Sequence, residues 1–253
     1  MIGIFDSGSG GLTVLRAIRD VLPSVDVLYY GDIKHAPYGS RPREELSQLT
    51  VASMQSLLQH GATSVVSACN SVSASLALSL FDAFSLSSDQ LIEMVGPTVS
   101  SFKGSSTRAV LAATPATVNA GLYKDAFAMI GKDLASLSIH DLAGAIERGE
   151  SGEVITAIVS DACRAIDWSK FDVLILGCTH YPLVESTFRA CLPAHVSIFD
   201  PALSVAARVE ARMWPREAGS GVTKFVITKD SEPFRRFIKE LFPGTTYTIE
   251  VVE

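Results

Sequence analysis

Two of the four cysteines in this 253-residue chain lie in the same kind of local sequence. Cys69 follows the apolar run 64–68, and Cys178 follows the apolar run 173–176 and a glycine. Such a thiol lies where a strand ends, which is where open α/β sheets bind ligands. Nearby backbone N–H groups and the helix dipole can lower the pKa of the thiol and so favour the reactive thiolate. Two thiols facing each other suit a two-base reaction, in which one removes a proton from a carbon and the other delivers one to the opposite face.

Other roles for thiols fit these positions less well. A buried cysteine often acts as a small apolar residue, and we assign that role to Cys163 and Cys191, which lie inside helical patterns. A disulfide between Cys69 and Cys178 would need Cα atoms about 6 Å apart, which leaves no room for a substrate. No Cys-x-x-Cys or histidine-rich spacing accompanies either thiol, so the sequence predicts no metal site.

A charged residue and a glycine-rich turn follow the first apolar run. Asp6 begins the segment Asp-Ser-Gly-Ser-Gly-Gly, but a dinucleotide fingerprint would need a third glycine at the position of Thr13. Asp6 is placed to orient an ammonium group or to assist proton transfer, and its alternative role is a helix N-cap. His180 follows Cys178 by two residues, and it is either an acid that tunes the thiol or an exposed turn residue.

Neutral hydrogen-bond donors gather at the other expected strand ends. Hydroxyls, an amide and exposed backbone N–H groups can hold carboxylates without a buried arginine, although each residue alone also fits a cap or a turn. We expect substrate contacts from Asn70, Ser71, Thr114, Thr117, Thr179 and the loop Pro37-Tyr38-Gly39-Ser40.

The elements that must position these residues alternate along the chain. Strands are expected at 2–5, 27–30, 64–68, 92–95, 109–112, 173–176, 196–199 and 225–227. Helices are expected at 12–21, 43–59, 117–130, 153–166, 183–191, 202–213 and 232–241. This alternation predicts an α/β fold with mostly parallel sheets covered by helices on both faces.

A faint internal repeat indicates two lobes. The segments around Cys69 and Cys178 are similar, and residues 4–7 can be laid on 112–115 at almost the same offset. We therefore predict two pseudo-symmetric α/β lobes, residues 1–96 plus 200–253 and residues 97–199, with the active site in the cleft between them. The first boundary is placed near Gly96-Pro97, where a proline punctuates the chain.

Composition excludes several function classes. With 47% hydrophobic and 19% charged residues the chain is a globular protein, and its net charge of −6 is the wrong sign for coating nucleic acid. The uncharged stretch between Glu45 and Asp82 is interrupted by polar residues every few positions, so we expect no membrane span. The N-terminus does not resemble a signal peptide, and the sparse cysteines favour a reducing compartment, so a cytoplasmic location is expected.

The four motifs together resemble the glutamate racemases of the cofactor-independent aspartate/glutamate racemase superfamily. The resemblance rests on residues 5–8 with 10–14, the loop 37–40, Cys69-Asn70-Ser71, and Gly-Cys-Thr-His-Tyr-Pro-Leu at 177–183. It extends through Asp200-Pro201 and the segment 225–244, so it covers nearly the whole chain. Three departures are visible: Ser71 stands where the family usually has threonine, Ser9 stands where an aliphatic residue is usual, and the stretch 138–144 before Glu147 lacks the usual proline-containing pattern.

The resemblance implies a function and a set of residues. It implies interconversion of L- and D-glutamate for peptidoglycan synthesis, with no cofactor and with a small acidic amino acid as the substrate. A homodimer is compatible with it. It implies that Cys69 and Cys178 are the two bases, assisted by Asp6 and His180, and that Glu147 supports the second thiol. Ser7 joins the substrate contacts on the same ground.

Three other functions stay open on the sequence. One is a racemase or epimerase of aspartate or another acidic amino acid. The second is a two-lobed binding protein without catalysis. The third, an NAD-dependent oxidoreductase, is the least supported, because Thr13 stands where a dinucleotide fingerprint would need a glycine.

Overall fold

The strands form two separate parallel sheets. The computed structural model describes residues 1–74, 84, 86–87 and 89–252. In this part of the chain the larger sheet has the order β10-β9-β2-β1-β3-β4, and the smaller has the order β6-β5-β7-β8. The larger sheet is built from β1 (Ile2–Asp6), β2 (Val27–Gly31), β3 (Ser64–Ser67), β4 (Leu91–Glu93), β9 (Thr223–Ile227) and β10 (Tyr247–Val251). The smaller is built from β5 (Ala109–Ala113), β6 (Leu134–Ser138), β7 (Val173–Gly177) and β8 (Ser197–Phe199). All these strand pairs are parallel, which confirms the predicted α/β class.

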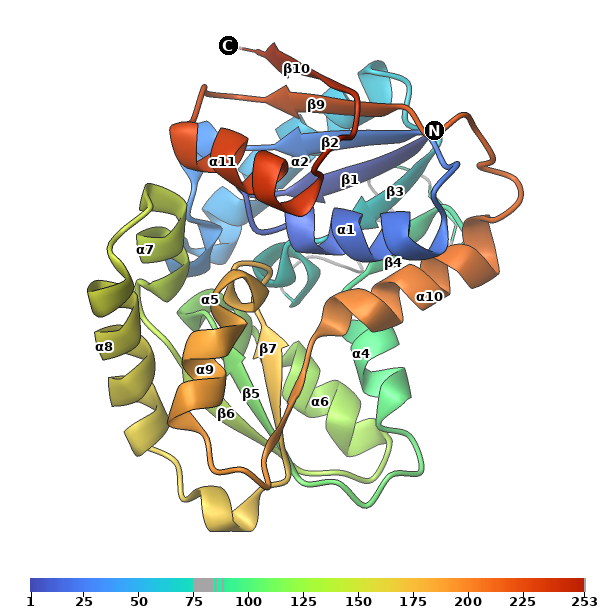
Figure 1. Ribbon diagram of the computed structural model, residues 1–253. Coiled ribbons are helices and arrows are strands. Elements are labelled where there is room, and N and C mark those ends of the chain that lie inside the picture. Colours follow the sequence, from blue (N-terminus) through green and yellow to red (C-terminus); the bar gives the residue numbers. More distant parts are fainter. Residues whose placement is uncertain (75–83, 85, 88, 253) are drawn as a thin grey trace.

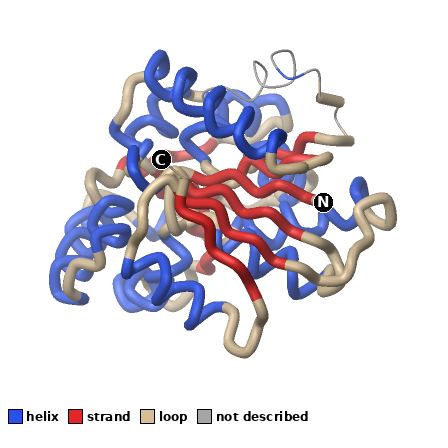
Figure 2. Tube along the Cα trace, turned by 90° about the horizontal axis from the view of Figure 1, so that it is seen from above, coloured by secondary structure: helices blue, strands red, loops and turns tan. Residues whose placement is uncertain are grey.

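Helices cover both sheets, as the views from the side and from above show (Figures 1 and 2). In chain order the α-helices are α1 (Leu12–Val21), α2 (Arg43–Gln59), α4 (Val95–Ser101), α5 (Pro115–Ala120), α6 (Leu122–Met129), α7 (Leu142–Arg148), α8 (Gly152–Arg164), α9 (Glu185–Cys191), α10 (Pro201–Met213) and α11 (Glu232–Leu241). Short 3-10 turns occupy η1 (Ile33–His35), η2 (Tyr38–Ser40), η3 (Trp168–Lys170) and η4 (Tyr181–Val184). None of the described helices is long and apolar enough to cross a membrane.

The central strands are buried along their whole length. Every residue of β1, β2, β5 and β7 is buried, as expected for parallel strands with helices on both faces. The sequence prediction missed β6 and β10. Both are edge strands with exposed positions, so neither carries a continuous apolar run.

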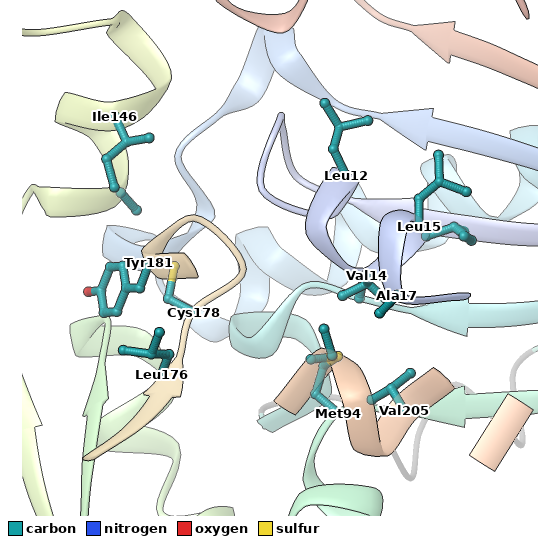
Figure 3. Packing of buried hydrophobic residues seen from close by; sticks show 14 of the residues in the cluster. Leu12, Val14, Leu15, Ala17, Met94, Ile146, Leu176, Cys178, Tyr181 and Val205 are labelled. Carbon is teal, nitrogen blue, oxygen red and sulfur yellow. The ribbon is translucent and has the colours of Figure 1, made fainter. Parts of the chain in front are cut away.

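Helices α1 and α10 connect the two sheets into one packed unit. Helix α10 follows β8 of the smaller sheet and runs alongside α1 of the larger one (Figure 1). Val14 and Ala17 of α1 lie close to Met94 and to Val205 of α10 (Figure 3), and all four are buried in one cluster that also contains residues of β5 and β7. This shared core fixes the position of one sheet relative to the other.

Two expectations about elements were wrong. The single helix expected at 117–130 is two helices, because Gly121 adopts a left-handed conformation with φ 75° that ends α5. The predicted strand 92–95 is shorter, and Gly96-Pro97 lies inside α4, where a proline in the first turn is tolerated. The division into lobes 1–96 plus 200–253 and 97–199 stays a prediction; below, "first lobe" and "second lobe" refer to the larger and the smaller sheet with their adjoining loops and helices.

Candidate functional site

Most of the predicted site residues lie at or just beyond the carboxyl ends of β1, β3, β5 and β7; the loop Pro37–Ser40 and Glu147 in α7 do not. The register pairs Phe5 with Ser67 in the first lobe and Ala113 with Gly177 in the second, so β1 and β3 end side by side, as do β5 and β7. Strand β7 points from the smaller sheet towards the larger one (Figure 1). The residues just beyond these ends therefore meet between the two lobes.

Both predicted thiols are buried and free. Cys69 is 4% exposed and its Sγ lies 3.6 Å from the Ser7 hydroxyl, while Cys178 is 6% exposed and its Sγ lies 3.9 Å from Nδ1 of His180. Burial and the nearby Asp6 carboxyl raise the pKa of Cys69 to about 12. The expectation of a lowered pKa was wrong for this thiol, because the backbone N–H of Val72 in the helical segment 70–74 does not offset the loss of water.

An ion pair lies beside the second thiol. The Nε2 atom of His180 is 2.6 Å from Oε2 of Glu147, and both side chains are buried. Burial opposes the charged form of each, yet the pKa of Glu147 is lowered by its hydrogen bond to the imidazole. The pKa of His180 is raised well above its ordinary value, against burial, by its hydrogen bonds to Cys178 and Glu147. The pair is therefore a carboxylate and an imidazolium, and His180 is a buried partner of the thiol rather than an exposed turn residue.

Ser9 holds the same carboxylate from the other lobe. Its backbone N–H donates to Oε2 of Glu147 at 2.8 Å, and its hydroxyl donates to Oε1 at 3.0 Å. In the sequence Ser9 is only a departure from the family pattern. Nothing in its local sequence indicates a partner that lies in α7, on the opposite lobe.

Asp6 also bridges the lobes. It is fully buried, its Oδ2 accepts the N–H of Gly8 at 3.0 Å, and its Oδ1 accepts the hydroxyl of Thr179 at 3.1 Å. Burial raises the pKa of Asp6, and the charge of His180 opposes that rise. The alternative role as a helix cap is excluded for α1, whose N-cap is Gly11.

The glycine-rich turn brings the two lobes into contact. A Cβ atom on Gly8 would lie 2.6 Å from Oε2 of Glu147, and one on Gly10 would overlap Thr179 and His180. Gly39 meets Thr114 in the same way, at 2.5 Å from its methyl carbon. These glycines allow close approach of the opposite lobe, where the sequence indicated close approach of a ligand.

The neutral donors form two groups. The hydroxyls of Ser71, Thr114 and Thr117 make a triangle with sides of 3.0, 3.4 and 3.1 Å, and all three residues are buried. Thr114 also caps α5, which confirms its local interpretation, and its contact with a substrate stays a prediction. The amide oxygen of Asn70 accepts the hydroxyl of Tyr123 at 2.6 Å. Within the described part of the chain its Nδ2 is a buried donor without a hydrogen-bond partner.

Tyr123 was not predicted. It is a fully buried tyrosine in α6, in the second lobe, and it fixes the amide of a first-lobe residue. A tyrosine in an amphipathic helix is ordinarily a core residue, so its sequence pattern carries no signal of this contact.

The loop Pro37–Ser40 lines a cavity of about 210 Å³. The wall opposite comes from the second lobe and includes Thr114, Ile139 and Gly144. Neither thiol lines this cavity. Tyr38 instead turns back into its own lobe, where its hydroxyl donates to the buried Asp32 at 2.5 Å.

No metal site accompanies these residues. Among the described residues, no group of three or more histidine, cysteine or acidic side chains is placed to hold an ion. The two thiols, Asp6 and the Glu147–His180 pair remain as the groups able to accept or donate protons, and the neutral donors remain as the groups able to hold anions. This set suits proton transfer at a carbon of a small carboxylate.

Comparison with known proteins agrees with the family resemblance seen in the sequence. A model of the Asp/Glu/Hydantoin racemase family matches residues 12–209. Among curated proteins, the glutamate racemase of Saccharopolyspora erythraea is 33% identical over 261 residues, which cover 100% of this chain and 95% of that protein.

Solved structures also resemble the whole chain. The glutamate racemase of Bacillus anthracis superposes with a TM-score of 0.88 at 27% identity, covering 100% of this chain and 97% of the other. The glutamate racemase of Thermus thermophilus, solved in complex with beta-chloro-D-alanine, superposes with a TM-score of 0.83 at 30% identity over 99% and 96% of the two chains.

Proposed function

Because the chain belongs to the Asp/Glu/Hydantoin racemase family, we propose that it interconverts L- and D-glutamate by proton transfer through two cysteine thiols. The observation that carries the proposal is the matched position of Cys69 and Cys178, each just beyond a strand of a different lobe. Relatives named glutamate racemase support the choice of substrate at 33% identity over nearly their full length.

The proposed reaction conserves protons. The thiolate of one cysteine takes the α-proton of glutamate and becomes a thiol, and the C–H electron pair remains on the substrate as a carbanion delocalised into the carboxylate. The thiol of the other cysteine protonates the opposite face and becomes a thiolate. Running the steps backwards exchanges the roles of Cys69 and Cys178, so each is the base in one direction.

The surroundings of the two thiols support different parts of this cycle. The His180 imidazolium, 3.9 Å from the sulfur of Cys178, stabilises negative charge on that sulfur during the transfer. Among the described residues no cation contacts Cys69, and its partner is the Ser7 hydroxyl. Its raised pKa of about 12 makes it the thiol in the free protein at neutral pH. We propose Asp6 and Glu147 as assisting groups, Asp6 by accepting a bond from the substrate ammonium and Glu147 by keeping His180 charged.

Substrate carboxylates are proposed to bind to neutral donors. Asn70 offers a buried Nδ2 that has no hydrogen-bond partner among the described residues, and the Ser71–Thr114–Thr117 triangle offers hydroxyls whose hydrogens can turn towards an anion. Thr179 and the loop Pro37–Ser40 complete the proposed contacts. Donors left unpaired by a shorter or uncharged side chain are costly, so we expect glutamate to be preferred over aspartate and glutamine.

The biological setting is part of the same proposal. We propose that the chain acts without a cofactor, in the cytoplasm, and supplies D-glutamate for peptidoglycan.

The experiment measures kcat/KM for both enantiomers of glutamate, aspartate and glutamine with no cofactor added. Replacing Cys69 or Cys178 by alanine removes a general acid–base group, so turnover should fall by at least about 10³-fold. Cys163→Ala is the matched control, because Cys163 is a buried cysteine in α8 outside the site, and it should retain activity. Equal or better turnover of aspartate would overturn the glutamate assignment, and near-normal turnover by either alanine variant would overturn the two-thiol mechanism.

A further inference from the structure

Ser9 contacts Glu147 through both its main chain and its side chain. Ser9 lies in the turn between β1 and α1, has no exposed surface, and reaches a carboxylate that lies 138 residues away in sequence. An aliphatic residue at this position could supply the backbone N–H and not the hydroxyl. The hydroxyl bond is therefore a property of the serine itself.

The two oxygens of Glu147 depend on Ser9 to different degrees. Oε2 accepts from the Ser9 N–H at 2.8 Å and from Nε2 of His180 at 2.6 Å. Oε1 accepts from the Ser9 hydroxyl at 3.0 Å, and no other hydrogen bond to it exists within the described part of the chain. Removing the hydroxyl would leave a charged, buried oxygen without a donor, which is costly.

The contact continues to the reacting sulfur through His180. Both ring nitrogens are engaged, Nε2 with Glu147 and Nδ1 with the sulfur of Cys178 at 3.9 Å. A rotation of the Glu147 carboxylate would therefore turn the ring and move its charge relative to the sulfur. Because Ser9 and Glu147 belong to different lobes, the chain Ser9–Glu147–His180–Cys178 is complete only when the lobes are together.

We propose that Ser9 is a positioning residue for the proton transfer carried by Cys178. It acts through Glu147 and His180: its hydroxyl keeps Glu147 ionised and in one orientation, and Glu147 keeps the His180 imidazolium facing the sulfur. The inference rests on the proposed racemase activity, and it assigns Ser9 no contact with the substrate.

The first test compares Ser9→Ala with Ser64→Ala. Ser64 is the matched control, because it is also fully buried and also donates its hydroxyl to a buried carboxylate, Oε1 of Glu217 at 2.6 Å. It lies at the amino end of β3, away from the site. We expect kcat of Ser9→Ala to fall about tenfold with less than about a threefold change in KM, and Ser64→Ala to keep wild-type kinetics.

The second test separates positioning from general structure. The carboxyl carbon of Glu147 is followed by ¹³C NMR over a pH titration, with its resonance identified by its absence in Glu147→Gln. Loss of the hydroxyl removes a bond to the charged form, so the pKa of Glu147 should rise by about one unit in Ser9→Ala and stay unchanged in Ser64→Ala. The double variant Ser9→Ala/Glu147→Gln should be no slower than Glu147→Gln alone, since both changes interrupt one chain of contacts.

Three results would overturn the proposal: an unchanged Glu147 titration in Ser9→Ala, a wild-type kcat in that variant, or losses that multiply in the double variant. The NMR titration needs no turnover. If the wild-type protein did not racemise glutamate, the proposed function would fail, while the titration would still decide whether the Ser9 hydroxyl controls Glu147.

Discussion

Cys69 should be protonated in the free protein throughout the neutral pH range. Its pKa of about 12 means that at about pH 8 roughly one molecule in 10,000 carries the thiolate, compared with about one in ten for a thiol of pKa about 9. The shift of about three units corresponds to about 4 kcal/mol in favour of the neutral form, and its main cause is the removal of a 4% exposed side chain from water.

Alkylation of the free protein measures this directly. The thiolate is the reactive species, so the alkylation rate at Cys69 should rise about tenfold for each pH unit up to about pH 11. Limited access multiplies the rate by a constant and leaves its slope with pH unchanged. The rate is followed by mass spectrometry of the Cys69 peptide, with the half-buried Cys191 as the reference for reagent decay. A rate that levels off below about pH 10 would refute the reasoning, because burial would then not control the protonation of this thiol.

Three further outcomes are expected. Tyr123→Phe removes the only described hydrogen bond to the amide oxygen of Asn70 and frees the amide to rotate. KM for glutamate should therefore rise about tenfold in steady-state assays, while the melting temperature falls by only a few degrees. An unchanged KM would contradict this role of Tyr123. Glu147→Gln should cost about 3 kcal/mol of unfolding free energy near neutral pH, measured in urea. The lowered pKa of Glu147 gives stability that is lost as pH falls through the folded-state pKa of Glu147, and the raised pKa of His180 gives stability that is lost as pH rises through the folded-state pKa of His180. The loss of unfolding free energy in Glu147→Gln should therefore shrink towards both extremes of pH. A loss that is independent of pH would contradict the ion pair. Gly10→Ala places a methyl group against the backbone and ring of His180, so activity should fall at least about a hundredfold, and wild-type activity would mean that the lobes do not pack as described.

Much of the fold follows from local pattern. The expected helices at 12–21, 43–59 and 232–241 have the observed ends; the first and the last each have one apolar face, and the second begins directly after Pro42. The central strands are within a residue or two of their predicted limits, since strands buried on both faces read as continuous apolar runs. Helix α7 was missed although Asp141, a common N-cap residue type, precedes it, because the helix has only seven residues and contains Gly144, which disfavours a helix interior.

The sequence indicated which residues belong to the candidate site, but it indicated few of the contacts between them. The equivalence of Cys69 and Cys178 is visible in sequence because each follows a strand, and strand ends of parallel sheets are predictable positions. The bonds that orient the site join residues far apart in the chain: 138 positions separate Ser9 from Glu147, and 53 separate Asn70 from Tyr123. Only packing of the lobes creates those pairs. The same packing removes water from around Cys69, and a local helix dipole does not compensate for that loss.

The central claim is that two thiols act on opposite faces of one carbon. Its most direct test places protiated L-glutamate with the protein in deuterated water and follows the α-position of both enantiomers by NMR during the first few per cent of conversion. Because the second thiol exchanges its proton with solvent and delivers it to the opposite face, nearly every D-glutamate molecule formed should carry deuterium while the remaining L-glutamate stays protiated, and the reverse labelling should hold from D-glutamate. Early D-glutamate that retains the original protium would show that a single group removes and returns the same proton, and would contradict the account.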